Sequence, residues 1–131
     1  MEGTFRKVLN AKIHGATVTD ANLAYEGSIT IPDDLLQRTG LLPNEAVWVW
    51  NVTTGARFET YILRGVAHSR EFHINGAAAH VATRGDTIII AGFTFLPFAL
   101  AQTHTPIAVF LGPDNSITTI RDERPATLAA V

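Results

Sequence analysis

The sequence predicts a single, mainly β domain that folds as a small closed barrel of six to eight strands with one or two short helices. The chain has 131 residues, the size of one domain, and 47% of them are hydrophobic, which is enough to fill a core. Short β-rich segments recur between turn residues along most of the length, and only one segment has a clear helical pattern. A closed barrel is favoured because closure removes the exposed edges of an open sheet.

The first strands lie before residue 32. Residues 5–13 are rich in β-forming side chains, and the His-Gly pair at 14–15 ends this segment before a short stretch at 17–19. Residues 20–23 contain an Asp-Ala-Asn sequence typical of a turn. Residues 28–31 alternate polar and apolar side chains, which predicts a half-buried strand that stops at the following proline.

One helix of about two turns follows this proline. Asp33 or Asp34 can cap its amino terminus by accepting a hydrogen bond from a free backbone amide. Leu35 and Leu36 supply its buried face, and Gly40 stands where the helix should end.

The most secure hairpin joins residues 46–51 to residues 57–63 through a Thr-Thr-Gly turn at 53–55. Alternation within the first strand places Trp48 and Trp50 on one face. We expect both tryptophans to pack in the core or in a subunit interface.

Further short elements follow the hairpin. Residues 71–74 form a predicted strand, and the Asn-Gly pair at 75–76 opens a small-residue run at 77–80 that predicts one turn of helix. The apolar run at 87–91 is typical of a strand buried on both faces, and residues 95–98 are expected to be irregular.

A last hairpin closes the chain. Residues 107–111 and 116–120 flank a Gly-Pro-Asp-Asn turn, and residues 121–131 are expected to form a flexible tail. At this length, residues 1–131 are expected to make one domain.

Composition excludes several functional classes. The net charge is -2 and only two of the basic residues are lysines. The chain therefore lacks the positive electrostatic potential that would attract nucleic acid. The absence of cysteine excludes disulfides, thiolate metal sites and a cysteine nucleophile. The amino terminus lacks the apolar segment of a signal peptide, and no apolar run reaches the ~20 residues needed to span a bilayer, which predicts a cytoplasmic protein without a membrane segment. His68, His73 and His80 lack ligand spacing and a carboxylate partner, so no metal is expected.

An ordered set of short motifs goes beyond fold class. Its centre is Tyr25-Glu26-Gly27-Ser28. The flanking motifs are Lys12-Ile13-His14, Trp50-Asn51-Val52-Thr53, Arg57-Phe58, Thr60-Tyr61 and Asn75-Gly76-Ala77-Ala78-Ala79-His80. In order and spacing the set resembles the bacterial aspartate 1-decarboxylase family from about residue 6 to residue 115. The resemblance implies a double-psi β-barrel, a homotetramer, and conversion of L-aspartate to β-alanine and CO2 for pantothenate and coenzyme A synthesis.

The resemblance also implies a pyruvoyl cofactor that the chain makes from Ser28. Loss of a carboxylate leaves a carbanion, and a protein-bound ketone that joins the substrate as a Schiff base can accept its electrons. If the Ser28 hydroxyl attacks the Gly27 carbonyl, an ester forms, and elimination followed by hydrolysis leaves the ketone at a new chain end. Gly27 suits this step because glycine tolerates strained backbone angles. Self-cleavage is therefore expected between Gly27 and Ser28, either spontaneously or with a maturation factor. Taken alone, a Gly-Ser pair is an ordinary turn.

The other site residues also follow from the resemblance. Arg57, whose planar fork suits a carboxylate, anchors the substrate side chain together with Lys12. Tyr61 returns the proton after CO2 leaves, and Thr60 assists cleavage and then contacts substrate. In a regular strand these two neighbours face opposite ways, so one of them is expected to act from a neighbouring subunit or a twisted segment.

A second set of assignments concerns backbone and smaller side chains. Asn75 supplies a polar contact, and Gly76, Ala77 and Ala78 bind substrate through free amides at the start of a short helix. His14 matches the family histidine and is a candidate of less defined role. Each of these residues taken singly has an ordinary structural explanation, in a turn or on a packed strand.

Two departures from the family pattern and two alternatives remain. Residues 95–100 are apolar where many members are acidic, and Gly15 replaces a basic residue. The first alternative is a double-psi barrel that has lost the reaction and serves as a binding or assembly module. The second is a decarboxylase of another acidic amino acid such as glutamate, because one methylene gives only ~1 to 3 kcal/mol of discrimination.

Overall fold

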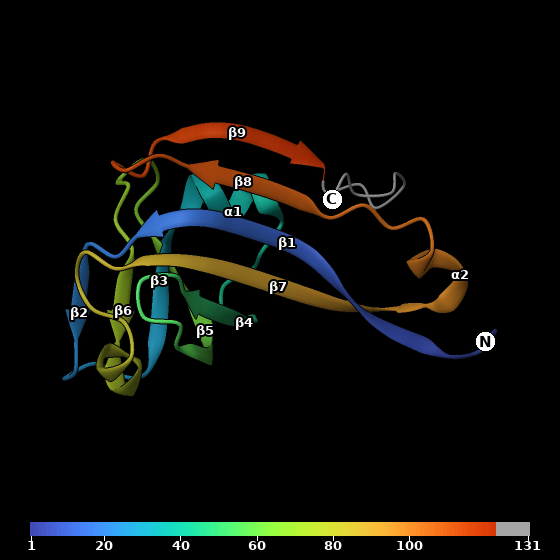
Figure 1. Cartoon of the computed structure of the whole chain (residues 1–131), viewed down its shortest axis with the longest axis horizontal. Coiled ribbons are helices and arrows are strands. Elements are labelled where there is room, and N and C mark those ends of the chain that lie inside the picture. Colours follow the sequence, from blue (N-terminus) through green and yellow to red (C-terminus); the bar gives the residue numbers. More distant parts are fainter. Residues whose placement is uncertain (123–131) are drawn as a thin grey trace.

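The strands of the protein form one curled sheet around a single core. The computed structural model describes residues 1–122. In this part of the chain the sheet has nine strands in the order β2-β6-β3-β5-β4-β7-β1-β8-β9 (Figure 1). The strands are β1 (Phe5–Thr17), β2 (Asp20–Asn22), β3 (Ser28–Pro32), β4 (Ala46–Asn51), β5 (Arg57–Gly65), β6 (His73–Asn75), β7 (Thr87–Pro97), β8 (Ile107–Leu111) and β9 (Ile117–Asp122).

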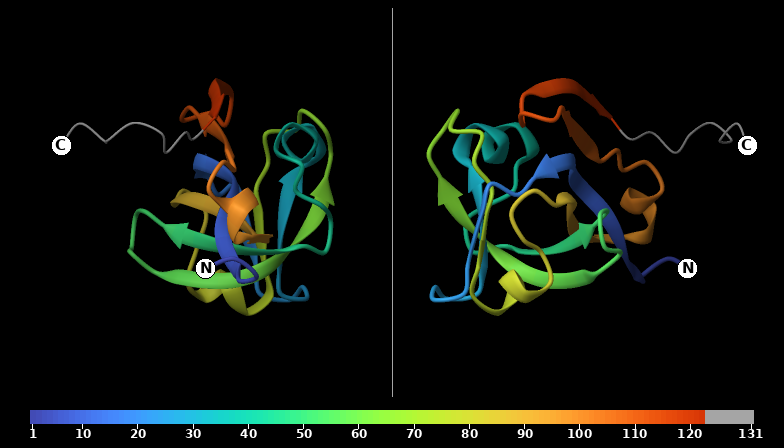
Figure 2. Two further views of the ribbon diagram at one scale, coloured as in Figure 1. Left: turned by 90° about the vertical axis from the view of Figure 1, so that its right-hand side faces the viewer. Right: turned by 60° about the vertical axis from the view of Figure 1, so that its left-hand side comes forward.

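Two short α-helices and one 3-10 helix complete the described chain. They are α1 (Asp33–Thr39), α2 (Phe98–Ala101) and η1 (Gly76–His80). α1 packs at one end of the curled sheet against β1, β3, β5 and β8, whereas α2 lies at the far end of the long β1–β7 ribbon (Figures 1 and 2). The mainly β prediction with one or two short helices is confirmed, with nine strands instead of six to eight.

The core is filled from strands at both ends of the sheet order. Ile13 of β1 and Val109 of β8 meet Ile29 of β3, Ile62 of β5 and Ile74 of β6 in one buried cluster. Because strands distant in the order share one core, the sheet curls into a barrel-like fold (Figure 2).

β1 does not end at the His14-Gly15 pair, as the sequence suggested. The register between β1 and β7 shifts between His14 and Ala16, and Gly15 lies there with a φ of 85°. Such a bulge needs the left-handed conformation that glycine adopts at little cost, so the strand continues to Thr17.

Two other segments predicted as irregular are strands. Residues 95–97 belong to β7 because they pair with residues 5–7 of β1. Residues 20–22, predicted as a turn, form β2 through parallel pairing with β6. In both cases the partner strand is distant in sequence, so local turn propensity is overridden by pairing that local sequence cannot indicate.

The helix α1 starts one residue earlier than a cap at Asp33 would require. Pro32 is its N-cap residue, and no side chain caps this end. Asp33 pairs with Arg64, and Asp34 accepts a hydrogen bond from the His68 backbone amide, so neither aspartate has the predicted capping role. Gly40 ends the helix in the left-handed conformation, as predicted.

The carboxyl-terminal prediction was partly wrong. Residues 121 and 122, placed in the expected tail, belong to β9 and pair with β8. The remaining residues of that expected tail, 123–131, lie outside the described part of the chain.

Candidate functional site

Ser28 is the first residue of β3 and is completely buried, whereas Gly27 before it is exposed. The Ser28 hydroxyl group donates a hydrogen bond to the Glu26 carbonyl oxygen at 3.1 Å, and its oxygen accepts one from Asn75 Nδ2 at 3.0 Å. Asn75 lies directly opposite Ser28 in the antiparallel β3–β6 pair. Asn75, which we expect to contact the substrate, thus donates to the Ser28 side chain.

Gly76 approaches the Gly27-Ser28 junction more closely than any side chain would allow. It has a φ of 70°, and a Cβ built on it would lie 2.5 Å from the Gly27 nitrogen and 2.8 Å from the Tyr25 carbonyl oxygen. Only glycine fits this position. Gly27, in contrast, is not in the left-handed region, and a Cβ there would meet the Asn75 carbonyl oxygen at an ordinary 4.0 Å. The close backbone approach that requires glycine is therefore at Gly76.

The small-residue segment forms the 3-10 helix η1 directly after Asn75. Asn75 is its N-cap residue, but its side chain does not cap the helix, because both of its donated hydrogen bonds go to β3. Ala77 is exposed and Ala78 packs against the core. The segment therefore lies beside the Ser28 junction and has only small side chains at residues 76–79.

Thr60 and Tyr61 lie on β5, the parallel neighbour of β3. Ile62 pairs with Ile29, so continuing this register places Tyr61 level with Ser28 and Thr60 level with Gly27. Ile29 and Ile62 both face the core, so Tyr61 shares the opposite face with Ser28. Thr60 points to the core side of the strand, as the alternation predicted.

Arg57, Lys12 and His14 lie on the outer face of the sheet. The row Arg57, Trp50, Ile89 and His14 runs across four paired strands, and Lys12 lies in the next row. The Arg57 guanidinium lies 4.8 Å from the centre of a Trp50 ring. The Lys12 ammonium and the His14 ring lie 5.5 and 5.1 Å from the Phe110 ring centre.

The outer face is hollowed around Arg57. A cavity of about 370 Å³ is lined by Lys7, Trp48, Trp50, Arg57 and Phe93. Trp48 and Trp50 share one face, as predicted. Both are half-exposed in this chain, so they line the hollow and do not belong to the buried core of the protein. Two cations beside aromatic rings make a surface suited to a carboxylate or to a second protein surface.

The expected site residues thus form two groups. Gly27, Ser28, Thr60, Tyr61 and the segment at 75–78 surround the junction, which we call the junction group. Lys12, His14 and Arg57 form the outer-face group. Arg57 is about 13 Å along β5 from Tyr61, and Lys12 is four strands from β3, about 19 Å along the sheet. Within one chain the two groups are therefore separated along the sheet.

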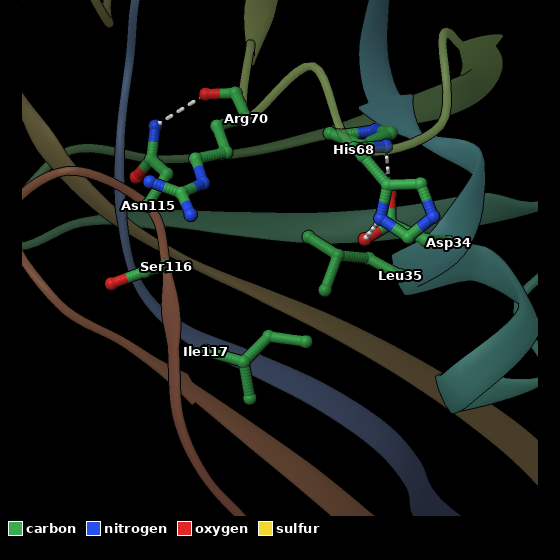
Figure 3. A pocket seen from close by; sticks show the side chains of 8 residues that line it. Asp34, Leu35, His68, Arg70, Asn115, Ser116 and Ile117 are labelled. Carbon is green, nitrogen blue, oxygen red and sulfur yellow. Dashed lines mark hydrogen bonds and ion pairs between the residues drawn. The ribbon is translucent and has the colours of Figure 1, made fainter.

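Another cavity contains none of these residues. It measures about 190 Å³ and lies between α1, the loop at 66–70 and the β8–β9 turn (Figure 3). His68 pairs with Asp34 there, and Arg70 pairs with Asp114. A hydrogen bond from the Ser116 hydroxyl holds the pKa of Asp114 below its ordinary value, with a smaller contribution from Arg70. Both basic side chains in this cavity thus already have acidic partners.

Thr30 and Asn51 make side-chain hydrogen bonds near β6 and η1 that the sequence did not predict. Asn75 Nδ2 also donates to Thr30 Oγ1 at 3.2 Å. Asn51 is buried, and its amide donates to Asp86 Oδ2 at 2.9 Å and to the Val81 carbonyl oxygen at 3.0 Å, which ties the end of the η1 region to the β4–β5 turn. The alternation at 28–31 places Thr30 on the face of Ser28 and was the available signal for Thr30.

Within residues 1–122, no three or more His, Asp or Glu side chains are grouped as they would be around a metal ion. No helix in the same range has both the length and the apolar character needed to cross a membrane.

Known proteins match nearly the whole chain. The sequence model of the family described as "Aspartate decarboxylase" matches residues 4–118, which include every residue of both groups. The protein named aspartate 1-decarboxylase of Legionella pneumophila (strain Lens) is 50% identical over 120 residues, 92% of this chain and 90% of its own. Proteins of the same name from Hyphomonas neptunium (strain ATCC 15444) and Rhodopirellula baltica (strain DSM 10527 / NCIMB 13988 / SH1) are similar. The Hyphomonas protein is 50% identical over 84% of this chain and 93% of its own length. The Rhodopirellula protein is 44% identical over 91% of this chain and 76% of its own length.

Proposed function

Because the chain belongs to the aspartate decarboxylase family, we propose that it decarboxylates L-aspartate with a pyruvoyl group made from its own Ser28. The products are β-alanine and CO2, and β-alanine supplies pantothenate synthesis. The observation that carries the cofactor assignment is the hydrogen bonding of the buried Ser28 hydroxyl between Glu26 and Asn75.

The hydrogen bond to Glu26 turns the Ser28 hydroxyl back across the Gly27-Ser28 peptide. Attack of Oγ on the Gly27 carbonyl carbon breaks the C–N bond and forms an ester, and the hydroxyl proton ends on the freed Ser28 nitrogen. Loss of the Ser28 α-proton then breaks the Cβ–Oγ bond and releases Gly27 as a carboxylate. Water replaces the nitrogen, which leaves as ammonia, so one water is consumed and no oxidant is needed.

The junction group fits a ketone at position 28. Asn75 Nδ2 is a donor already aimed at the Ser28 side chain, and the Gly76 backbone lies against the junction without an intervening Cβ. A pyruvoyl ketone at this position supplies the electron sink that decarboxylation requires. Tyr61, on the same face one strand away, is the proposed proton donor, and Thr60 is the proposed aid to cleavage.

The outer-face group is proposed to bind the substrate side-chain carboxylate. Arg57 offers two parallel N–H donors, and Lys12 adds a second charge on the same face. Because these residues lie far from Ser28 of their own chain, we propose that a neighbouring subunit of a homotetramer supplies them. The hollow beside Arg57, with its exposed aromatic edges, is a surface that such a neighbour would cover.

Substitution of Ser28 tests the proposal. The Ser28→Ala chain should fold, stay at full length and release no CO2 from L-aspartate, because it has no hydroxyl for the attack. Intact-mass measurement after prolonged incubation gives the readout, and Ser69→Ala serves as a control on a serine outside the junction. Cleavage or β-alanine production by the Ser28→Ala chain would refute the assignment.

Three narrower points belong to the same proposal. Release of CO2 from L-aspartate and from L-glutamate, measured side by side, decides the substrate, and we expect aspartate. Incubation of the purified precursor alone distinguishes spontaneous cleavage from cleavage that needs a maturation factor. A cytoplasmic location remains a prediction of the sequence.

A further inference from the structure

We propose that Thr30 is a positioning residue for self-cleavage, acting on Ser28 through Asn75. This inference rests on the proposed function, because it concerns the step that makes the cofactor. The observation behind it is that one side-chain amide donates to two hydroxyl groups. Asn75 Nδ2 lies 3.0 Å from Ser28 Oγ and 3.2 Å from Thr30 Oγ1.

The hydrogen bonds fix the orientation of the Asn75 amide. Ser28 has one hydroxyl proton and donates it to the Glu26 carbonyl oxygen, so its oxygen must act as an acceptor toward Asn75. The amide nitrogen, and not the amide oxygen, therefore faces Ser28. Its two N–H groups are used by the two hydroxyls, and both hydrogen bonds favour this orientation of the amide plane.

Thr30 is placed for this role by strand geometry. Ser28 and Thr30 are two residues apart on β3 and project from the same face, and Asn75 is directly across from Ser28 on β6. Asn75 is buried, so loss of the Thr30 hydroxyl would leave one of its N–H groups without an acceptor. A rotated amide could satisfy that group only by weakening its hydrogen bond to Ser28.

The hydrogen bond to Ser28 Oγ matters most in the elimination step. In the ester, Oγ is the bridging oxygen, and when the Cβ–Oγ bond breaks it gains negative charge as part of the Gly27 carboxylate. A donor held at 3.0 Å stabilises that charge without having to reorganise. Thr30 thus favours elimination by holding the Asn75 donor in place.

The position tolerates informative substitutions. Thr30 is half-buried at the edge of a hollow of about 210 Å³, and its methyl group lies beside Gly65. Thr30→Val keeps this methyl group and removes the hydroxyl, whereas Thr30→Ser keeps the hydroxyl and removes the methyl group. The pair separates hydrogen bonding from packing, and Thr30→Ala is a second hydroxyl-free variant if the valine does not fold.

The experiment follows self-cleavage of purified full-length precursors by intact mass. Thr30→Val should cleave about three- to tenfold more slowly than the unsubstituted chain, and Thr30→Ser within about twofold of it. Hydroxylamine added after denaturation splits esters, so it should cut a larger fraction of the uncleaved Thr30→Val chain. Unchanged cleavage with no extra ester in Thr30→Val, or equal impairment in Thr30→Ser, would overturn the proposal.

A second readout does not depend on cleavage. In a Ser28→Ala background, the Asn75 side-chain amide protons should exchange with solvent faster in Thr30→Val than in Thr30→Ser, measured by ¹⁵N NMR. Equal exchange would overturn the positioning role. If the unsubstituted chain never cleaves, the proposed function fails, while this NMR comparison still decides the role of Thr30.

Discussion

Gly76 lies against Gly27 so closely that a Cβ at position 76 would be 2.6 Å from the Gly27 Cα atom. The turn that starts the 3-10 helix η1 thus lies close to the backbone of Gly27, the residue before the peptide bond proposed to break, although Gly27 and Gly76 are 49 residues apart in sequence. This contact makes Gly76 the most direct test of how the junction is held.

Gly76→Ala should reduce self-cleavage at least tenfold, because the new methyl group collides with backbone atoms of residues 25 and 27. Gly55→Ala is the matched control: Gly55 has a similar positive φ of 84°, but a Cβ added there would have no atom within 4 Å. Both variants carry the cost of a left-handed alanine, and only Gly76→Ala adds the collision. Equal cleavage of the two variants, followed by intact mass, would show that the close approach does not matter.

Arg57→Lys should raise KM for L-aspartate about ten- to hundredfold with a smaller effect on kcat, because lysine keeps the charge but loses the two parallel donors. Self-cleavage should be unaffected, since Arg57 lies about 13 Å along β5 from Tyr61, the residue level with Ser28. Arg84→Ala, at an exposed turn, is the control and should leave KM within about twofold. An unchanged KM for Arg57→Lys would remove Arg57 from the substrate site.

Two inactive chains should restore activity when they assemble together. In a mixed oligomer, an Arg57→Ala chain can supply Ser28 while a Ser28→Ala chain supplies Arg57 from its outer face. Co-expression should therefore give activity well above that of either variant alone, measured as β-alanine release. If the mixture stays inactive although mass measurement shows mixed oligomers, Ser28 and Arg57 of each site come from one chain and the shared-site proposal is wrong.

Tyr61→Phe should cleave normally but lose about a hundredfold or more in kcat, because the ring still packs on β5 while the proton donor is gone. Cleavage is followed by intact mass and turnover by β-alanine release. A kcat close to that of the unsubstituted protein would mean that another group returns the proton.

Local sequence predicted those parts of the fold that local chemistry determines. Gly40 ends α1 because a left-handed residue is needed there, and the alternation at 46–51 places Trp48 and Trp50 together. The errors arose where pairing between distant segments decides the outcome. β2 exists only through its parallel pairing with β6, and the end of β7 only through its pairing with the start of β1.

The resemblance named candidate site residues but could not give their positions in the folded chain. The resemblance supplied Ser28 and Asn75, and the structure places them in contact. It could not supply the distance between Ser28 and Arg57, because that depends on the strand order of the folded sheet. The sequence predicts a need for glycine at position 27, whereas the position where the folded backbone leaves no room for a Cβ is 76.

Reductive trapping tests the central claim most directly. The purified protein is incubated with L-aspartate and a hydride reductant, and the chains are then separated and weighed. We predict two chains divided between Gly27 and Ser28, with a covalent substrate adduct at residue 28 of the longer one and none in the Ser28→Ala protein. A cleaved protein that carries no adduct at residue 28, or an active protein that remains a single uncleaved chain, would contradict the account.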